Sequence, residues 1–114
     1  MMKLFLIPLL LSFLAAPACA ASLPTLKMLS TTTCPACVQM SKVLDEINAK
    51  YAGKLATEHV YLENNMDVAK RYNVRYVPTL IFVDASGKDV AQEVGYRTMA
   101  QVLETFRKAG IDIR

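Results

Sequence analysis

The sequence predicts a single α/β domain with a mixed four-stranded sheet flanked by helices. Three observations lead to this prediction. Segments with strand and helix patterns alternate along most of the chain. Residues 77–83 form a near-continuous apolar run, which is typical of a central strand covered on both faces. The short turn at residues 84–88 predicts an antiparallel hairpin, whereas a strand–helix–strand unit requires a parallel crossover, so the sheet combines both orientations.

The first half of the predicted domain is a strand, a helix and a second strand. Residues 26–30 alternate well enough for a short strand. Apolar side chains at helical spacing then predict a helix over residues 38–51, with Gly53 as its stop. Residues 56–62 form the second predicted strand.

The second half continues with helix, strand, strand and helix. Asn64 and Asn65 suit the cap of a short helix that runs to Tyr72. The apolar run and residues 90–94 are the two strands of the hairpin. Thr98 and Gln101 have the spacing of a capping box, which predicts a final helix.

Residues 1–20 have the pattern of a cleavable secretory signal peptide. Lys3 supplies a positive start, residues 4–14 an apolar segment, and Ala18-Cys19-Ala20 a small-residue cleavage site. The apolar segment is too short to span a bilayer as a helix, although an uncleaved anchor is the alternative. Cleavage after Ala20 would leave residues 21–114 as the mature domain, exported to a compartment such as the periplasm.

Cys19 gives the N-terminus a second possible fate. A cut before Cys19 would produce a lipidated N-terminus, but Ala16-Pro17-Ala18 lacks the Leu that bacterial lipoprotein signals carry at this place. Cleavage after Ala20 removes Cys19 and reduces the three cysteines to two. In either case we expect an exported domain in an environment where disulfides persist.

The charge of the chain argues against one class of function, nucleic-acid binding. Thirteen Lys and Arg residues face ten Asp and Glu residues, a net charge of +3. These charges are scattered and form no basic run, so nucleic-acid binding is not expected. We expect a monomer that needs no cofactor.

The main candidate for a reactive site is the motif Cys34-Pro35-Ala36-Cys37, whose two thiols lie between the first predicted strand and the first predicted helix. A thiolate at a helix N-terminus is stabilised by unpaired N–H groups and by the helix dipole, which lowers its pKa. Thiol–disulfide exchange is the leading hypothesis. A zinc half-site is one alternative, but zinc needs four ligands and His59 is the single histidine. An inert structural disulfide is the other.

Two motifs together resemble the thioredoxin superfamily. Cys-Pro-Ala-Cys opens the first helix, and Val77-Pro78-Thr79 opens the third strand. Residues 71–80 resemble the thioredoxin segment that leads into its cis-proline. The resemblance covers roughly residues 26–109 and implies a compact thioredoxin-like fold that lacks the first strand and helix of full thioredoxins.

The resemblance implies roles for the matched residues. Cys34 would be the attacking thiolate and Cys37 the thiol that resolves the mixed disulfide. Pro78 would be cis and face the sulfurs, while the backbone of Val77 would pair with a substrate chain. The alternative is a trans proline at the start of a strand. Two tyrosines that flank these loops, Tyr76 and Tyr96, are candidates for lining a substrate groove.

The sequence departs from the thioredoxin pattern at three positions. Thr33 replaces the Trp before the first cysteine, Met28 replaces a buried Asp, and His59 replaces a buried Lys. His59 is therefore a candidate proton acceptor near the thiols, the alternative being a histidine bonded to backbone or water. We expect Thr33, Pro35, Ala36 and His59 to tune the two thiols.

The function implied by this resemblance is an exported thiol–disulfide oxidoreductase that acts on protein thiols and disulfides. Reduction of exported proteins, such as apocytochromes, is favoured because DsbA-type oxidants carry a helical insertion that this chain lacks; a reductant would need a membrane redox partner as its electron donor. One alternative is a DsbA-like oxidant. The other is a soft-metal module that holds Cu(I) on the cysteine pair, with Met40 nearby in sequence.

Overall fold

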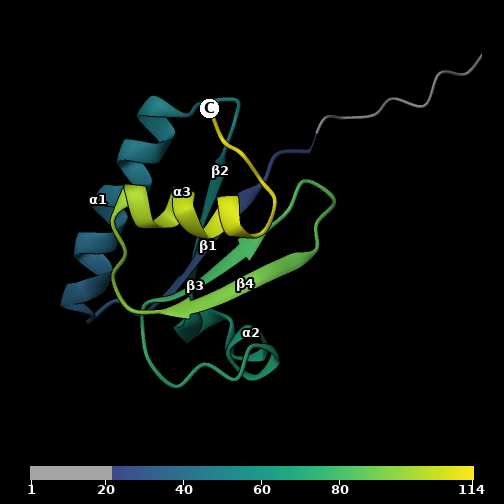
Figure 1. Ribbon diagram of the computed structural model, residues 1–114. Coiled ribbons are helices and arrows are strands. Elements are labelled where there is room, and N and C mark those ends of the chain that lie inside the picture. The colour runs from purple at the N-terminus through teal and green to yellow at the C-terminus, as the bar shows by residue number, and fades with distance from the viewer. Residues whose placement is uncertain (1–21) are drawn as a thin grey trace, which may run out of the picture.

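The computed structural model describes residues 22–114, so the predicted signal peptide and Cys19 lie outside the described residues. The described chain forms one four-stranded sheet with helices packed on it (Figure 1). The elements, in chain order, are β1 (Thr25–Ser30), α1 (Pro35–Lys50), β2 (Ala56–Tyr61), the 3-10 turn η1 (Leu62–Asn64), α2 (Met66–Arg71), β3 (Thr79–Val83), β4 (Asp89–Val94) and α3 (Met99–Lys108). Apart from the added 3-10 turn, this is the predicted order.

The sheet has the strand order β2-β1-β3-β4, and it is mixed, as predicted. β1 pairs parallel with β2 and antiparallel with β3, and β3 pairs antiparallel with β4. β1 and β2, which α1 connects, are parallel, as expected for a strand–helix–strand unit. β2 and β3, which α2 connects, run in opposite directions. β2 and β3 are not neighbours, since β1 lies between them, and the loop after the six-residue helix α2 returns the chain in the opposite direction.

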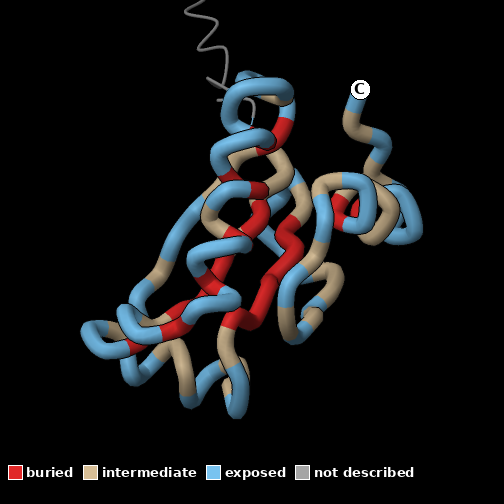
Figure 2. The backbone as a smooth tube through the Cα atoms, turned by 90° about the vertical axis from the view of Figure 1, so that its left-hand side faces the viewer, coloured by how far each residue is buried: buried red, intermediate tan, exposed pale blue. Residues whose placement is uncertain are grey.

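Helices cover both faces of the sheet. α1 and α3 pack on one face, where Met40 and Ile47 of α1 and Phe106 of α3 are fully buried with Phe82 of β3. The rings of Phe82 and Phe106 meet edge to face with centroids 5.0 Å apart. α2 covers the other face, over Leu29, Ile81 and Val83. All five residues of β3 are buried, so the prediction of a central strand covered on both faces is confirmed (Figure 2).

Two predicted boundaries move by several residues. The first helix begins at Pro35 instead of residue 38, because proline needs no N–H partner in the first turn and Cys34 caps the helix. The third strand begins at Thr79 instead of Val77, because Pro78 has no N–H to donate to a neighbouring strand.

The capping residues of the other two helices were also predicted from the sequence. α3 has a complete capping box: Thr98 Oγ1 accepts the Gln101 N–H at 3.2 Å, and Gln101 Oε1 accepts the Thr98 N–H at 2.9 Å. Asn65 is the N-cap residue of α2, but its side chain makes no capping bond and donates instead to the Tyr61 carbonyl at 2.8 Å.

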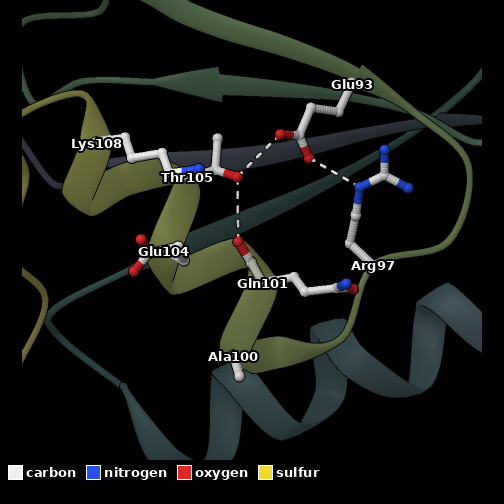
Figure 3. A pocket seen from close by; sticks show the side chains of 7 residues that line it. All are labelled: Glu93, Arg97, Ala100, Gln101, Glu104, Thr105 and Lys108. Carbon is white, nitrogen blue, oxygen red and sulfur yellow. Dashed lines mark hydrogen bonds and ion pairs between the residues drawn. The ribbon is translucent and has the colours of Figure 1, made fainter.

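A polar network joins β4 to α3 beside a cavity of about 350 Å³. The carboxylate of Glu93 accepts hydrogen bonds from Arg97 Nε at 3.1 Å and from Thr105 Oγ1 at 2.9 Å (Figure 3). Because both oxygens of Glu93 are engaged, this network fixes α3 against the sheet. No helix among residues 22–114 is long and apolar enough to cross a membrane.

Candidate active site

The site is built at the N-terminus of α1. Cys34 is the N-cap residue with extended backbone angles, and Pro35 occupies the first turn. Cys34 Sγ accepts the backbone N–H of Cys37 at 3.1 Å, as a capping oxygen would. Cys34 and Cys37 form a disulfide whose Cα atoms are 5.2 Å apart. The predicted placement of the motif at a strand-to-helix junction is therefore confirmed.

The two sulfurs differ in their surroundings. Cys34 is 8% exposed and Cys37 is 3% exposed. The neighbours Thr33, Pro35 and Ala36 are all exposed, so the surface around Cys34 is formed by small side chains. Both cysteines are buried, and Cys34 is the slightly more exposed residue of the pair.

The loop before β3 lies against Cys34. The Val77–Pro78 peptide bond is cis, as the resemblance implied, and Pro78 is buried. The carbonyl oxygen of Val77 lies 3.7 Å from Cys34 Sγ. The Gly95 N–H donates to the Pro78 carbonyl at 2.8 Å, which joins this loop to the segment after β4. Tyr76 and Tyr96 therefore stand on two loops that meet at Pro78.

Both tyrosines are exposed. Tyr76 is 71% exposed and Tyr96 is 45% exposed. Tyr76 lies on a groove of about 510 Å³ that runs from the Val77 loop along α2, whereas Tyr96 is not among the residues that line it. The groove is lined mostly by apolar side chains: Thr31, Leu62, Met66, Ala69, Val74, Arg75, Tyr76 and Val77. Of the two predicted tyrosines, only Tyr76 lines this groove, which reaches the active site through Val77.

His59 lies near the disulfide but in a different cavity from the groove that Tyr76 lines. It shares the wall of a cavity of about 190 Å³ with both cysteines and with Ser30. His59 Nε2 and the hydroxyl of Ser30 form a hydrogen bond. The sequence had offered backbone or water as the partner of this histidine, and the structure adds a side-chain partner, Ser30. Partial burial of the ring lowers the pKa of His59 below its usual 6.5, which favours the neutral imidazole.

The loop between β1 and Cys34 is anchored by a carboxylate. Glu63 Oε1 accepts the backbone N–H of Thr32 at 2.7 Å and the Thr32 hydroxyl at 3.1 Å. These hydrogen bonds, the backbone one above all, lower the pKa of the Glu63 carboxyl. Glu63 thus holds the segment two residues before the capping cysteine.

Sequence reasoning missed Ser30 and Glu63. Ser30 is a small polar residue at the end of a strand, and its importance depends on a partner 29 residues away. Glu63 lies 31 residues from Thr32, and no local pattern links the two. The replacement of the family's Lys by His59 was the one signal that pointed toward this side of the site.

Comparison with known proteins agrees with this geometry. The family described as thioredoxin-like domain matches residues 16–110. Thioredoxin of Pseudomonas aeruginosa is 37% identical over 79 residues, which cover 68% of this chain and 70% of that protein. Thioredoxin 1 of Nostoc sp. is 35% identical over 74 residues, covering 62% and 68%. Thioredoxin C-2 of Corynebacterium nephridii is 37% identical over 62 residues, which span only 56% of its length.

Solved structures show the same fold. A structure described as that of a malarial protein superposes with a TM-score of 0.70 at 18% identity, covering 77% of this chain and 98% of that chain. Thioredoxin-2, described as a component of malaria parasite protein secretion machinery, gives a TM-score of 0.68 at 22% identity, covering 76% and 84%. With the family match and the cysteine pair at the start of α1, the chain belongs to the thioredoxin-like domain family and is a thiol–disulfide oxidoreductase.

Proposed function

We propose that the protein is exported and reduces disulfide bonds in other exported proteins. The main support is the Cys34–Cys37 disulfide. Cys34 caps α1, and its sulfur lies beside the Val77 carbonyl. Export is supported by the signal-peptide pattern of residues 1–20. Electrons would come from a redox partner in the membrane, since each catalytic cycle leaves the cysteine pair oxidised.

The first step is attack by Cys34. In the reduced protein the Cys37 N–H and the N-terminus of α1 stabilise a thiolate at Cys34, which is the more exposed residue of the pair. The thiolate attacks one sulfur of the substrate disulfide, the substrate S–S bond breaks, and the other substrate sulfur leaves as a thiolate. The product is a mixed disulfide between Cys34 and the substrate.

The second step is resolution by Cys37. The Cys37 thiol loses its proton and attacks Cys34 Sγ, which breaks the mixed disulfide and releases the second substrate thiolate. The two substrate thiolates take up protons, so two electrons and two protons pass from the cysteine pair to the substrate. The Cys34–Cys37 disulfide of the structure is the product of this step.

Two features support reduction over oxidation. Residues 22–114 form the thioredoxin-like core with no helical insertion of the kind that DsbA-type oxidants carry. The Glu63 carboxylate adds negative charge to the loop before Cys34, which disfavours the thiolate and so makes the reduced pair a stronger reductant. A DsbA-like oxidant remains the competing function.

The substrate is proposed to bind across the Val77 loop. The backbone of Val77 lies next to Cys34, so an extended substrate segment that pairs with it would bring a disulfide to Cys34 Sγ. Tyr76 and the apolar groove along α2 offer a surface for side chains next to the substrate cysteine. Tyr96 would contact the substrate from the neighbouring loop.

Trapping of the mixed disulfide tests this proposal. The full chain with Cys37→Ser attacks substrates but cannot resolve them, so it should accumulate covalent adducts with exported proteins that are cleaved by dithiothreitol. Mass spectrometry of the adducts should find the N-terminal peptide beginning at Ala21. Cys34→Ser is the matched control and should form none. Adducts with Cys34→Ser but not with Cys37→Ser would contradict the assigned order of attack.

A further inference from the structure

We propose that Ser30 and His59 form a proton relay that deprotonates Cys37 during resolution. The inference rests on the proposed function and assigns its second step to two further residues. Ser30 is fully buried, and its hydroxyl is hydrogen-bonded to His59 Nε2. Both residues line the same cavity as Cys34 and Cys37. The Ser30 hydroxyl is bonded to a partly exposed imidazole in a cavity that Cys37 also lines, and this shared cavity offers the thiol proton a route to solvent.

β1 has no carboxylate of its own beside His59. His59 lies opposite Met28 in the β1–β2 ladder, and Met28 is fully buried and cannot accept a proton. Ser30 follows two residues later on the same face of β1, toward the cysteines. The pair therefore supplies a base on the side of the sheet where Cys37 lies.

Several charged and titratable groups surround His59. From α1, Asp45 shares a second cavity wall with it, and the two cysteines share the first. On its own strand, the ring of Tyr61 stacks on it with centroids 4.3 Å apart, and Glu58 pairs with Lys27 of β1 at 3.9 Å. Partial burial of the ring lowers the pKa of His59 below 6.5, so the imidazole is mostly neutral at pH 7 and can accept a proton.

The proton transfer is balanced. A neutral imidazole protonated at Nδ1 leaves Nε2 as an acceptor for the Ser30 hydroxyl. When Cys37 reacts, its thiol proton passes to Ser30 Oγ, directly or through a water in the cavity, while the hydroxyl proton passes to His59 Nε2. Cys37 becomes the thiolate that attacks Cys34, and His59 becomes an imidazolium. His59 then returns its proton to solvent or to the departing substrate thiolate.

Ellman's reagent separates the two steps. The reduced protein releases one thionitrobenzoate when Cys34 attacks and a second when Cys37 resolves the mixed disulfide. Thionitrobenzoate leaves without a proton, so the second rate reports on the deprotonation of Cys37. In the wild type this rate should fall as pH decreases through the lowered pKa of His59. His59→Gln should slow the second release about 10²-fold at pH 7, the low end of general base catalysis, and remove that pH dependence.

Ser30 is tested by three matched variants. Ser30→Ala should slow the second release at least about tenfold and flatten its pH profile, while Ser30→Thr, which keeps the hydroxyl, should restore both. Ser41→Ala removes a hydroxyl from the same cavity that donates to the Cys37 carbonyl at 2.9 Å and not to His59, and it should leave the profile unchanged. In all variants the first release should keep its wild-type rate.

The outcomes distinguish this inference from the proposed function. A normal first release with an unchanged second release in both Ser30→Ala and His59→Gln would overturn the relay and leave the oxidoreductase intact. A second release that is slowed by His59→Gln but not by Ser30→Ala would show that Ser30 does not take part in the relay. Absence of both releases in the wild type would overturn the oxidoreductase itself. Because His59 is the single histidine, NMR titration of its ring adds a check: Ser30→Ala should change its pKa, and an unchanged pKa would contradict the coupling.

Discussion

Cys34 has two roles that a single substitution separates. Its sulfur is one half of the disulfide, and it also accepts the Cys37 N–H as the cap of α1. A serine at this position keeps a side-chain oxygen that can accept the same N–H. Cys34→Ser therefore removes the chemistry while it preserves the start of the helix, which makes it a control for exchange that does not depend on unfolding.

The contribution of the Glu63 carboxylate to stability should depend on pH. Its pKa is lowered in the folded protein, mainly by the Thr32 backbone N–H, so its contribution to stability is complete above the usual value of 4.5 and is lost as pH falls through the lower folded value. The free energy of unfolding should therefore be greater for the wild type than for Glu63→Gln at neutral pH, and the difference should shrink on acidification. Denaturant titrations at a series of pH values measure this difference.

The control for Glu63 is Thr32→Ala. It removes the longer of the two hydrogen bonds but keeps the backbone N–H that donates at 2.7 Å. Most of the pH dependence should remain in this variant. A wild-type advantage over Glu63→Gln that stays constant with pH would show that the carboxylate charge does not anchor the loop.

At the scale of elements, α3 depends on its cap. The capping box satisfies two N–H groups at the start of α3, so Thr98→Ala should reduce the free energy of unfolding by about 1 kcal/mol. Thr98→Ser keeps the hydroxyl and should be close to neutral. Urea unfolding of the three proteins measures the effect. Equal stability of Thr98→Ala and the wild type would mean that packing of Phe106 alone determines α3.

The elements show where prediction from sequence succeeds. The capping box and the cysteine pair are local patterns, so Thr98, Gln101 and Cys34 could be placed from the sequence alone. The hairpin turn was also local: Asp84 accepts three hydrogen bonds from Ser86 and Lys88. The start of β3 was misplaced because apolar character continues through Val77, although Pro78 cannot pair as a strand residue.

Contacts distant in sequence account for what was missed. The bonds of Ser30 to His59 and of Thr32 to Glu63 join β1 and its loop to β2 and η1, and they exist because the parallel register brings these elements side by side. Neither follows from periodicity or capping rules. The order of the strands likewise depends on pairing between distant segments, because β1 lies between β2 and β3 in the sheet.

On the scale of the whole molecule, different parts of the site lie on the two faces of the sheet. Ser30 and His59 lie on the face that α1 covers, while the apolar groove beside Tyr76 follows α2 on the other. Cys34 lies where the two meet, with the Val77 carbonyl 3.7 Å from its sulfur. The arrangement places proton transfer on one side of the reacting sulfur and substrate contact on the other.

The reduction potential of the Cys34–Cys37 pair decides whether it acts as a reducing couple. The purified protein is equilibrated against glutathione and dithiothreitol buffers, and the fraction of Cys34–Cys37 disulfide is measured after acid quenching and alkylation. For a reductant we expect a potential near the roughly −270 mV of thioredoxin. A potential near the roughly −120 mV of DsbA would mean an oxidant and would contradict it.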